Sequence, residues 1–218
     1  MTSVSPVSGK PNLLLGAYDL TTVGYGAEEF FVSGTAQSYA PPGSAEYTTR
    51  IVVLLPTDAA TFNGTAIVEW LNVSGGIDAP AVWLMAHREI VREGYAYVGV
   101  SVQQVGVEGG ASLVGVDMSL KAQDPQRYSA LHHPGDAFAY DIYTQVGLLI
   151  RAGAVGGFKP ETVLAVGESQ SAAFLTTYVN DVDALAETYD GFLVHSRFGP
   201  AAPLTGISVF EGTAALTH

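Results

Sequence analysis

One serine of this sequence stands where a nucleophile could be held for attack. In VLAVGESQSAAFLTTYV (163–179), an apolar run leads to GESQS (167–171), and a segment with the apolar spacing of a helix follows at once. The glycine of GESQS permits a sharp turn, and its final serine is small enough to let the helix approach the strand. The main-chain N–H of Gln170 would then point at negative charge that develops beside the Ser169 hydroxyl, assisted by the helix dipole. A serine placed in this way is typical of a nucleophile elbow.

Ser169 also has a structural alternative. A serine at the start of a helix often accepts a hydrogen bond from the first helical turn and so caps the helix. The motif G-x-S-x-S alone does not separate a cap from a nucleophile. The order of buried strand, serine and helix favours the nucleophile.

Four stretches of the sequence, one of which contains Ser169, show a resemblance that goes beyond the serine motif. Together they resemble the alpha/beta hydrolase domain family whose elbow reads G-E-S-Q-S, within the α/β-hydrolase superfamily, over roughly residues 45–200. The resemblance implies an α/β-hydrolase fold and acyl transfer to Ser169. The stretches are IVEWLNVSGG (67–76), YSALHHPGDAFAYDIYTQ (128–145), VGESQSAAFLTTYVN (166–180) and YDGFLVHSR (189–197).

The resemblance also implies main-chain donors for an oxyanion. In such proteins a loop after an earlier strand supplies an N–H group that acts beside that of Gln170. The segment LNVSGG (71–76) follows a predicted strand and precedes a predicted helix, so Val73 and Ser74 are the candidates. A glycine-rich turn without a catalytic role is the alternative.

An acid and then a histidine should follow the serine, if the resemblance holds. Two histidines come after Ser169: His195 falls at the end of a predicted strand, and His218 is the last residue. Glu211, in the possible strand ISVFEG (207–212), is the candidate acid, and His195 is a candidate base. Neither histidine has the expected place. We therefore expect the chain to be the N-terminal part of a longer member and to be nearly inactive alone.

These observations lead to two hypotheses of function. The first is a serine hydrolase that cleaves carboxylic esters through an acyl-enzyme on Ser169, with a small-molecule ester as substrate and no cofactor. An ester is favoured over an amide because an ester demands less of the acid that protonates the leaving group. The second is a non-catalytic α/β-hydrolase-like domain, a fragment or pseudo-enzyme that binds a small ligand or a partner chain.

The elements that must position Ser169 follow from the hydrophobic pattern. Apolar runs without polar alternation predict strands, and segments of helical period separate them. This order predicts a single α/β domain over residues 1–218, with a mostly parallel sheet, helices on both faces and the last strands missing. An exposed sheet edge would then favour a homo-oligomer. The predicted strands are 50–56, 65–72, 95–102, 161–167 and 191–196, and the predicted helices are 78–94, 136–153 and 170–185.

Some polar residues outside the elbow suggest other roles. Adjacent His132 and His133 diverge in most backbone conformations and lack a partner at metal-binding spacing, so we expect no metal site. Asp78 and Asp136 stand where they could cap the helices that follow them.

The composition narrows the classes of partner. The 21 acidic and 9 basic residues give a net charge of −12, which disfavours nucleic acids and anionic membranes as partners. Hydrophobic residues make up 48% of the chain, enough for a large core. No apolar run has the length of a signal peptide or a membrane span, so we expect a cytoplasmic protein.

Overall fold

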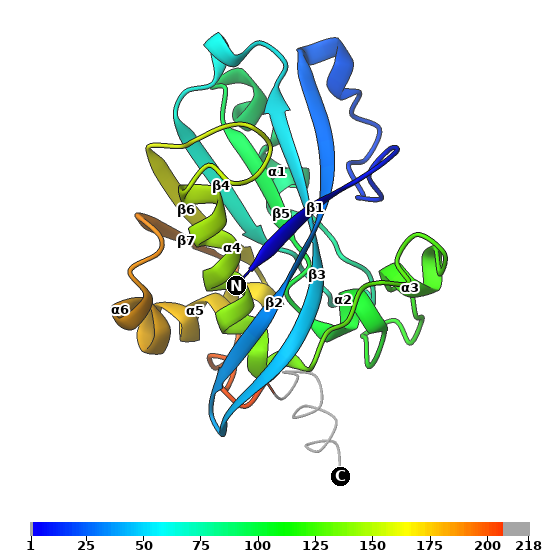
Figure 1. Cartoon of the computed structure of the whole chain (residues 1–218), viewed down its shortest axis with the longest axis vertical. Helices are drawn as coiled ribbons and strands as arrows, with labels where there is room; N and C mark the ends of the chain where they lie inside the picture. The colour runs from blue at the N-terminus through cyan, green and yellow to red at the C-terminus, as the bar shows by residue number, and fades with distance from the viewer. Residues whose placement is uncertain (1, 207–218) are drawn as a thin grey trace.

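The computed structural model describes residues 2–206, which form a seven-stranded sheet with helices packed on it (Figure 1). The strand order is β1-β2-β3-β5-β4-β6-β7. The strands are β1 (Ser3–Val7), β2 (Tyr25–Tyr39), β3 (Pro42–Pro56), β4 (Thr65–Trp70), β5 (Ala96–Val100), β6 (Thr162–Glu168) and β7 (Gly191–His195). The helices are α1 (Ala81–Arg92), α2 (Gln104–Glu108), α3 (Leu120–Gln123), α4 (Ala139–Arg151), α5 (Gln170–Thr177) and α6 (Asp183–Ala186). Shorter helical turns lie at Leu20–Val23, Ala59–Thr61, Asp136–Phe138 and Tyr178–Val182.

The predicted α/β class is confirmed, with a sheet that is parallel in one half and antiparallel in the other. Strands β5, β4, β6 and β7 run parallel, and all four match predicted strands. Strands β1, β2 and β3 pair antiparallel, and β3 joins the two halves by an antiparallel pairing with β5. The sheet is therefore mixed, and its antiparallel half is larger than the sequence pattern indicates.

The antiparallel half is dominated by a long hairpin of β2 and β3. The two strands pair continuously from Tyr25 opposite Pro56 to Tyr39 opposite Pro42. Buried and exposed residues alternate near the end of β2, as expected where one face of a strand packs on the core. The chain reverses between Tyr39 and Pro42 in a tight turn, and the strand predicted at 50–56 is the C-terminal end of β3.

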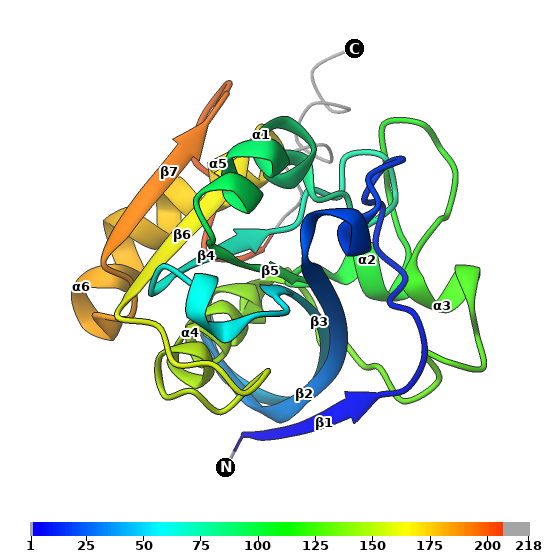
Figure 2. The same ribbon diagram turned by 90° about the horizontal axis from the view of Figure 1, so that it is seen from above.

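Helices cover both faces of the parallel half, as predicted (Figure 2). On one face, Trp70 of β4 packs against Tyr143 of α4 and Phe174 of α5, with ring centroids 4.9 and 5.4 Å apart. On the other face, Trp83 of α1 packs against Tyr97 of β5, with ring centroids 5.2 Å apart. These aromatic contacts fix the helices around β4 and β6. The carboxyl end of β6 leads into the turn at Ser169, the elbow, and that of β4 leads into the loop at 71–76.

The predicted cap of α1 by Asp78 is wrong. The Asp78 carboxylate lies 2.7 Å from a guanidinium nitrogen of buried Arg50. The first turn of α1 is capped from the sheet instead: Glu69 of β4 accepts hydrogen bonds from the N–H groups of Val82 and Trp83, at 2.8 and 3.1 Å. A buried carboxylate thus holds the N-terminus of α1 against the sheet.

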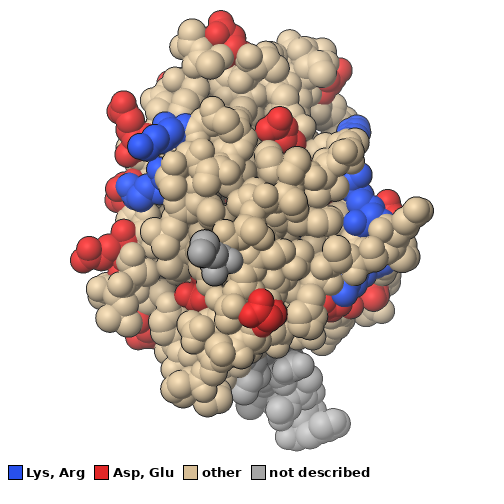
Figure 3. Space-filling model, viewed as in Figure 1, with Lys and Arg blue, Asp and Glu red and all other residues tan. Residues whose placement is uncertain are grey.

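On the face that Figure 3 shows, acidic side chains are spread out rather than gathered in one patch. On the face shown, lysine and arginine side chains lie toward the sides. No helix within residues 2–206 is long and apolar enough to cross a membrane.

Candidate active site

Ser169 lies at the junction of β6 and α5, and its backbone is held in an unusual conformation. Its φ is 56° and its ψ is −112°, outside the regions that residues with a side chain normally occupy. The Ser169 N–H donates a hydrogen bond of 3.0 Å to the carbonyl of His195 on β7. Conformations of this kind cost about 1–3 kcal/mol and persist only where the surrounding structure imposes them, which is most often at functional sites.

The side chain of Ser169 does not cap α5. It makes no capping hydrogen bond, and the residue is partly exposed at the carboxyl end of the sheet. Ser171 makes the local contact instead, because its hydroxyl donates to the Glu168 carbonyl at 2.8 Å. The structural alternative for Ser169, a helix cap, therefore does not hold.

Gln170 occupies the first position of α5, where its main-chain N–H has no helical partner. Its side chain is buried and reaches two other loops. The Nε2 group donates to Gln103 Oε1 at 2.9 Å, and Oε1 accepts from the N–H of Val73 at 3.4 Å. Gln170 thus ties the elbow to the loops that follow β4 and β5.

The loop after β4 lies against the elbow, but both of its candidate oxyanion donors are engaged. The N–H of Val73 points at Gln170 Oε1 over a long distance for a hydrogen bond, 3.4 Å. The N–H of Ser74 donates to Asn72 Oδ1 at 2.9 Å, within its own turn. The Asn72 amide also donates to the Glu168 carbonyl at 2.9 Å. Val73 is therefore the amide aimed at the elbow, whereas Ser74 holds the shape of the loop.

His195 ends β7 beside the elbow, and no hydrogen bond joins its imidazole to the Ser169 hydroxyl. The imidazole Nδ1 lies 2.9 Å from the hydroxyl of Ser196. In the strand register His195 is opposite Glu168. Burial raises the pKa of Glu168, and nearby His195 lowers it in part. The candidate acid Glu211 lies outside the described residues.

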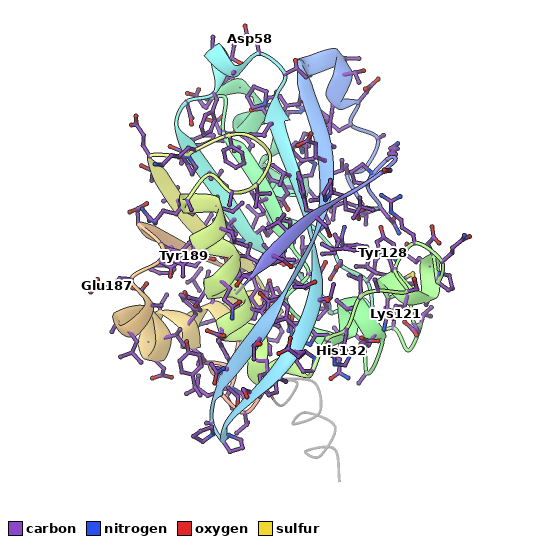
Figure 4. All side chains as sticks on the ribbon, viewed as in Figure 1. Asp58, Lys121, Tyr128, His132, Glu187 and Tyr189 are labelled. Carbon is purple, nitrogen blue, oxygen red and sulfur yellow. The ribbon has the colours of Figure 1, made fainter. Side chains whose placement is uncertain are left out.

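His132 and His133 have separate surroundings. The His132 ring is exposed on the side of α2 and α3 (Figure 4), 4.0 Å from Glu108, which also binds Lys121 at 2.7 Å. His133 is buried, its Nε2 donates to the Val102 carbonyl at 2.7 Å, and burial lowers its pKa. Within the part of the chain that the structure describes, no group of three or more histidine or acidic side chains is placed to hold a metal ion.

Sequence reasoning missed Gln103 and gave Asp136 the wrong role. Gln103 follows β5 and is buried; its Nε2 donates to Asp136 Oδ2 at 3.1 Å. Asp136 Oδ1 accepts the N–H of Gln104 at 2.7 Å, so its carboxylate serves the loop after β5 rather than capping the next helix. A glutamine directly after a buried strand, at the same sheet edge as Ser169, is the signal that could have identified Gln103.

Comparisons with known proteins agree with this architecture. The model of a family described as an alpha/beta hydrolase domain matches residues 3–212. Comparison with curated proteins gives no match.

Several solved structures are similar to this chain at low identity. A bacterial brefeldin A esterase, a homologue of human hormone-sensitive lipase, is 14% identical over 81% of this chain and 41% of its own, with a TM-score of 0.45. Oligopeptidase B of Trypanosoma brucei is 12% identical over 81% of this chain and 21% of its own, with a TM-score of 0.44. An esterase of the fungus Rhizomucor miehei is 12% identical over 84% of this chain and 52% of its own, with a TM-score of 0.42. The chain thus spans between 21% and 52% of the length of these three proteins.

Proposed function

The chain belongs to the alpha/beta hydrolase domain family, and we propose that it is a serine hydrolase that acts on carboxylic esters with Ser169 as its nucleophile. The observation that carries the proposal is the strained backbone of Ser169 between a parallel strand and the N-terminus of a helix. A serine on such a turn presents its hydroxyl beyond the end of the sheet, where a substrate can reach it.

In the proposed reaction, Ser169 Oγ attacks the carbonyl carbon of the ester while a general base takes the hydroxyl proton. The carbonyl oxygen becomes an oxyanion, which accepts hydrogen bonds from the N–H groups of Gln170 and Val73. Val73 exchanges its long bond to Gln170 Oε1 for a stronger bond to a charged oxygen. The intermediate then expels the alcohol, which takes up the proton, and leaves an acyl group on Ser169. Water attacks the acyl carbon, releases the carboxylic acid and regenerates the hydroxyl.

We infer that the substrate is a small-molecule ester and that no cofactor takes part. The attack on an ester carbonyl needs a nucleophile, a base and oxyanion donors, and protein groups can supply all three. An alcohol leaves more readily than an amine, so the ester reaction demands less of the group that protonates the leaving atom.

A fluorophosphonate probe tests the proposal on the full-length product of the gene. We expect the probe to label Ser169, as located by mass spectrometry of peptides, and Ser169→Ala to abolish the label. Ser196→Ala is the matched control, because Ser196 also follows a strand and also has a positive φ, 51°. This control should be labelled at the wild-type rate.

Labelling that persists in Ser169→Ala, or no labelling of a folded wild-type protein, would refute the serine hydrolase. The second of these results would favour the non-catalytic domain that binds a ligand or a partner chain.

A further inference from the structure

A chain of buried hydrogen bonds connects the elbow to the start of α4. Asp136 Oδ2 accepts from Gln103 Nε2 at 3.1 Å, Gln103 Oε1 accepts from Gln170 Nε2 at 2.9 Å, and Gln170 Oε1 accepts from Val73 N–H at 3.4 Å. The indole of Trp70 joins the chain, because its Nε1 donates to Gln103 Oε1 at 3.1 Å. The side chains of all four polar or aromatic residues in this chain lie in the protein interior.

Asp136 and Trp70 fix the orientation of both glutamine amides. The carboxyl oxygens of Asp136 accept hydrogen bonds from the N–H of Gln104 and from Gln103 Nε2, and the indole N–H of Trp70 can only donate. Gln103 must therefore turn its NH₂ group to Asp136 and its oxygen to Trp70. That oxygen in turn requires the NH₂ group of Gln170, which leaves the Gln170 oxygen facing Val73. A flip of either amide would place donor against donor or acceptor against acceptor.

The chain crosses the carboxyl ends of three neighbouring strands. Val73 belongs to the loop after β4, Gln103 to the loop after β5, and Gln170 to the elbow after β6. We propose that Gln103 is a positioning residue of the active site: through Gln170 it holds the Val73 amide against the elbow, in the place where the oxyanion forms. Gln103 does not touch the substrate. This inference rests on the proposed serine hydrolase.

An exchange of carboxylate and amide between two positions tests the inference. In Asp136→Asn the new amide can satisfy Gln104 with its oxygen only by turning its NH₂ group against that of Gln103. In Gln103→Glu two carboxylates face each other at this contact. In the double variant Asp136→Asn/Gln103→Glu, the carboxylate introduced at position 103 accepts from the new amide at position 136, from Trp70 and from Gln170 at once. Every hydrogen bond of the chain then exists again, with the net charge unchanged.

The full-length gene product is measured for fluorophosphonate labelling rate, for kcat and KM on p-nitrophenyl acetate, and for thermal unfolding. Loss of a direct oxyanion donor lowers kcat by roughly 10²–10³-fold, so a displaced donor should lower it by about tenfold. We expect this loss in each single variant, mainly in kcat with KM little changed, and recovery to within about threefold of wild type in the double variant. If Asp136→Asn fails to fold, Gln103→Met replaces it, because methionine keeps the volume and removes the hydrogen bonds.

Each of the following results would overturn the inference. If wild type is labelled at Ser169 and both single variants are labelled at the same rate, Gln103 does not position the site, although the serine hydrolase stands. If the single variants lose activity only in proportion to lost thermal stability, the row of hydrogen bonds is merely structural. The same conclusion follows if the double variant stays as slow as the single variants. Failure of wild type to label refutes the proposed function itself, and the inference falls with it.

Discussion

At the scale of single residues, Glu69 shows how burial makes one carboxyl sensitive to pH. It is fully buried, and it accepts hydrogen bonds from the N–H groups of Val82 and Trp83 and from the hydroxyl of Tyr97. Burial is the largest cause that raises its pKa, to about 7, and the three hydrogen bonds offset part of that rise. The folded protein therefore keeps the Glu69 proton over a range of pH in which the unfolded chain has lost it.

This shift predicts that the free energy of unfolding falls as pH rises from about 4.5 to about 7. Below this pH range the Glu69 carboxyl is neutral in both the folded and the unfolded state. Within the range only the folded state binds the proton, so raising the pH favours the unfolded state. The full effect is on the order of 3 kcal/mol, since each pKa unit corresponds to about 1.36 kcal/mol. Urea unfolding at a series of pH values measures how the free energy of unfolding depends on pH. Glu69→Gln should lose this dependence, whereas Glu161→Gln, at an exposed position, should keep it. An equal slope in Glu69→Gln and wild type would contradict the assignment.

Single residues also show what a sequence can reveal about the site. Ser169 could be identified because its signal is local: a strand, a small-residue turn and a helix within one stretch of chain. The hydrogen-bond partners of Gln103 and Glu69 could not be identified, because these partners lie on other elements and only the folded sheet brings them together. The loop after β4, which carries the candidate oxyanion donors, falls between these cases, since its place after β4 was predictable but the engagement of both amides was not.

At the scale of elements, the elbow depends on how closely α5 approaches β6. The φ of Gly167 is not positive, so this glycine is needed for space rather than for a turn. A Cβ atom at Gly167 would lie 3.1 Å from the main-chain carbonyl of Ser171, which cannot move without the helix. Sequence reasoning named the right glycine and gave the wrong reason.

We expect Gly167→Ala to destabilise the protein by about 1–3 kcal/mol, the usual cost of forcing an extra methyl into a packed region, and to slow labelling of Ser169. Gly191→Ala on β7 is the matched control. Its Cβ would lie 3.2 Å from the tip of the Leu164 side chain, which can rotate away. Chemical unfolding and labelling rates distinguish the two variants. Equal stability of Gly167→Ala and Gly191→Ala would show that the close approach of α5 to β6 does not require glycine at position 167.

The antiparallel half shows why some elements escaped the sequence pattern. Strands β4, β5 and β6 are buried or half-buried along their length and consist mostly of apolar residues, which makes them easy to recognise. Strand β2, YGAEEFFVSGTAQSY, has one partly exposed face and many small or polar residues. Strand β2 therefore forms because it pairs with β3, and its own composition does not indicate a strand.

At the scale of the whole molecule, the sheet ends at β7 within the described residues. An edge strand presents unpaired N–H and C=O groups, and protected edges usually carry lysine, proline or a bulge. Strand β7, GFLVH, carries none of these, and Leu193 and Val194 are 48% and 38% exposed. A second copy of the chain offers the same edge, and two copies of β7 can pair antiparallel about a two-fold axis. We propose that this edge mediates a homodimer of the 218-residue chain.

The net charge of −12 opposes this association, because two copies repel each other. Added salt shortens the screening length from about 30 Å at 0.01 M to about 10 Å at 0.1 M, so we predict that the fraction of dimer rises with salt concentration. Sedimentation velocity should show species of one and two chains of 22.8 kDa. Val194→Lys places a charge on the β7 edge and should leave only monomer at every salt concentration. Ser5→Lys, an exposed position on β1 at the opposite edge of the sheet, should dimerise as wild type does. A wild-type chain that stays monomeric in high salt would refute the dimer. A dimer that Ser5→Lys disrupts and Val194→Lys does not would place the contact elsewhere.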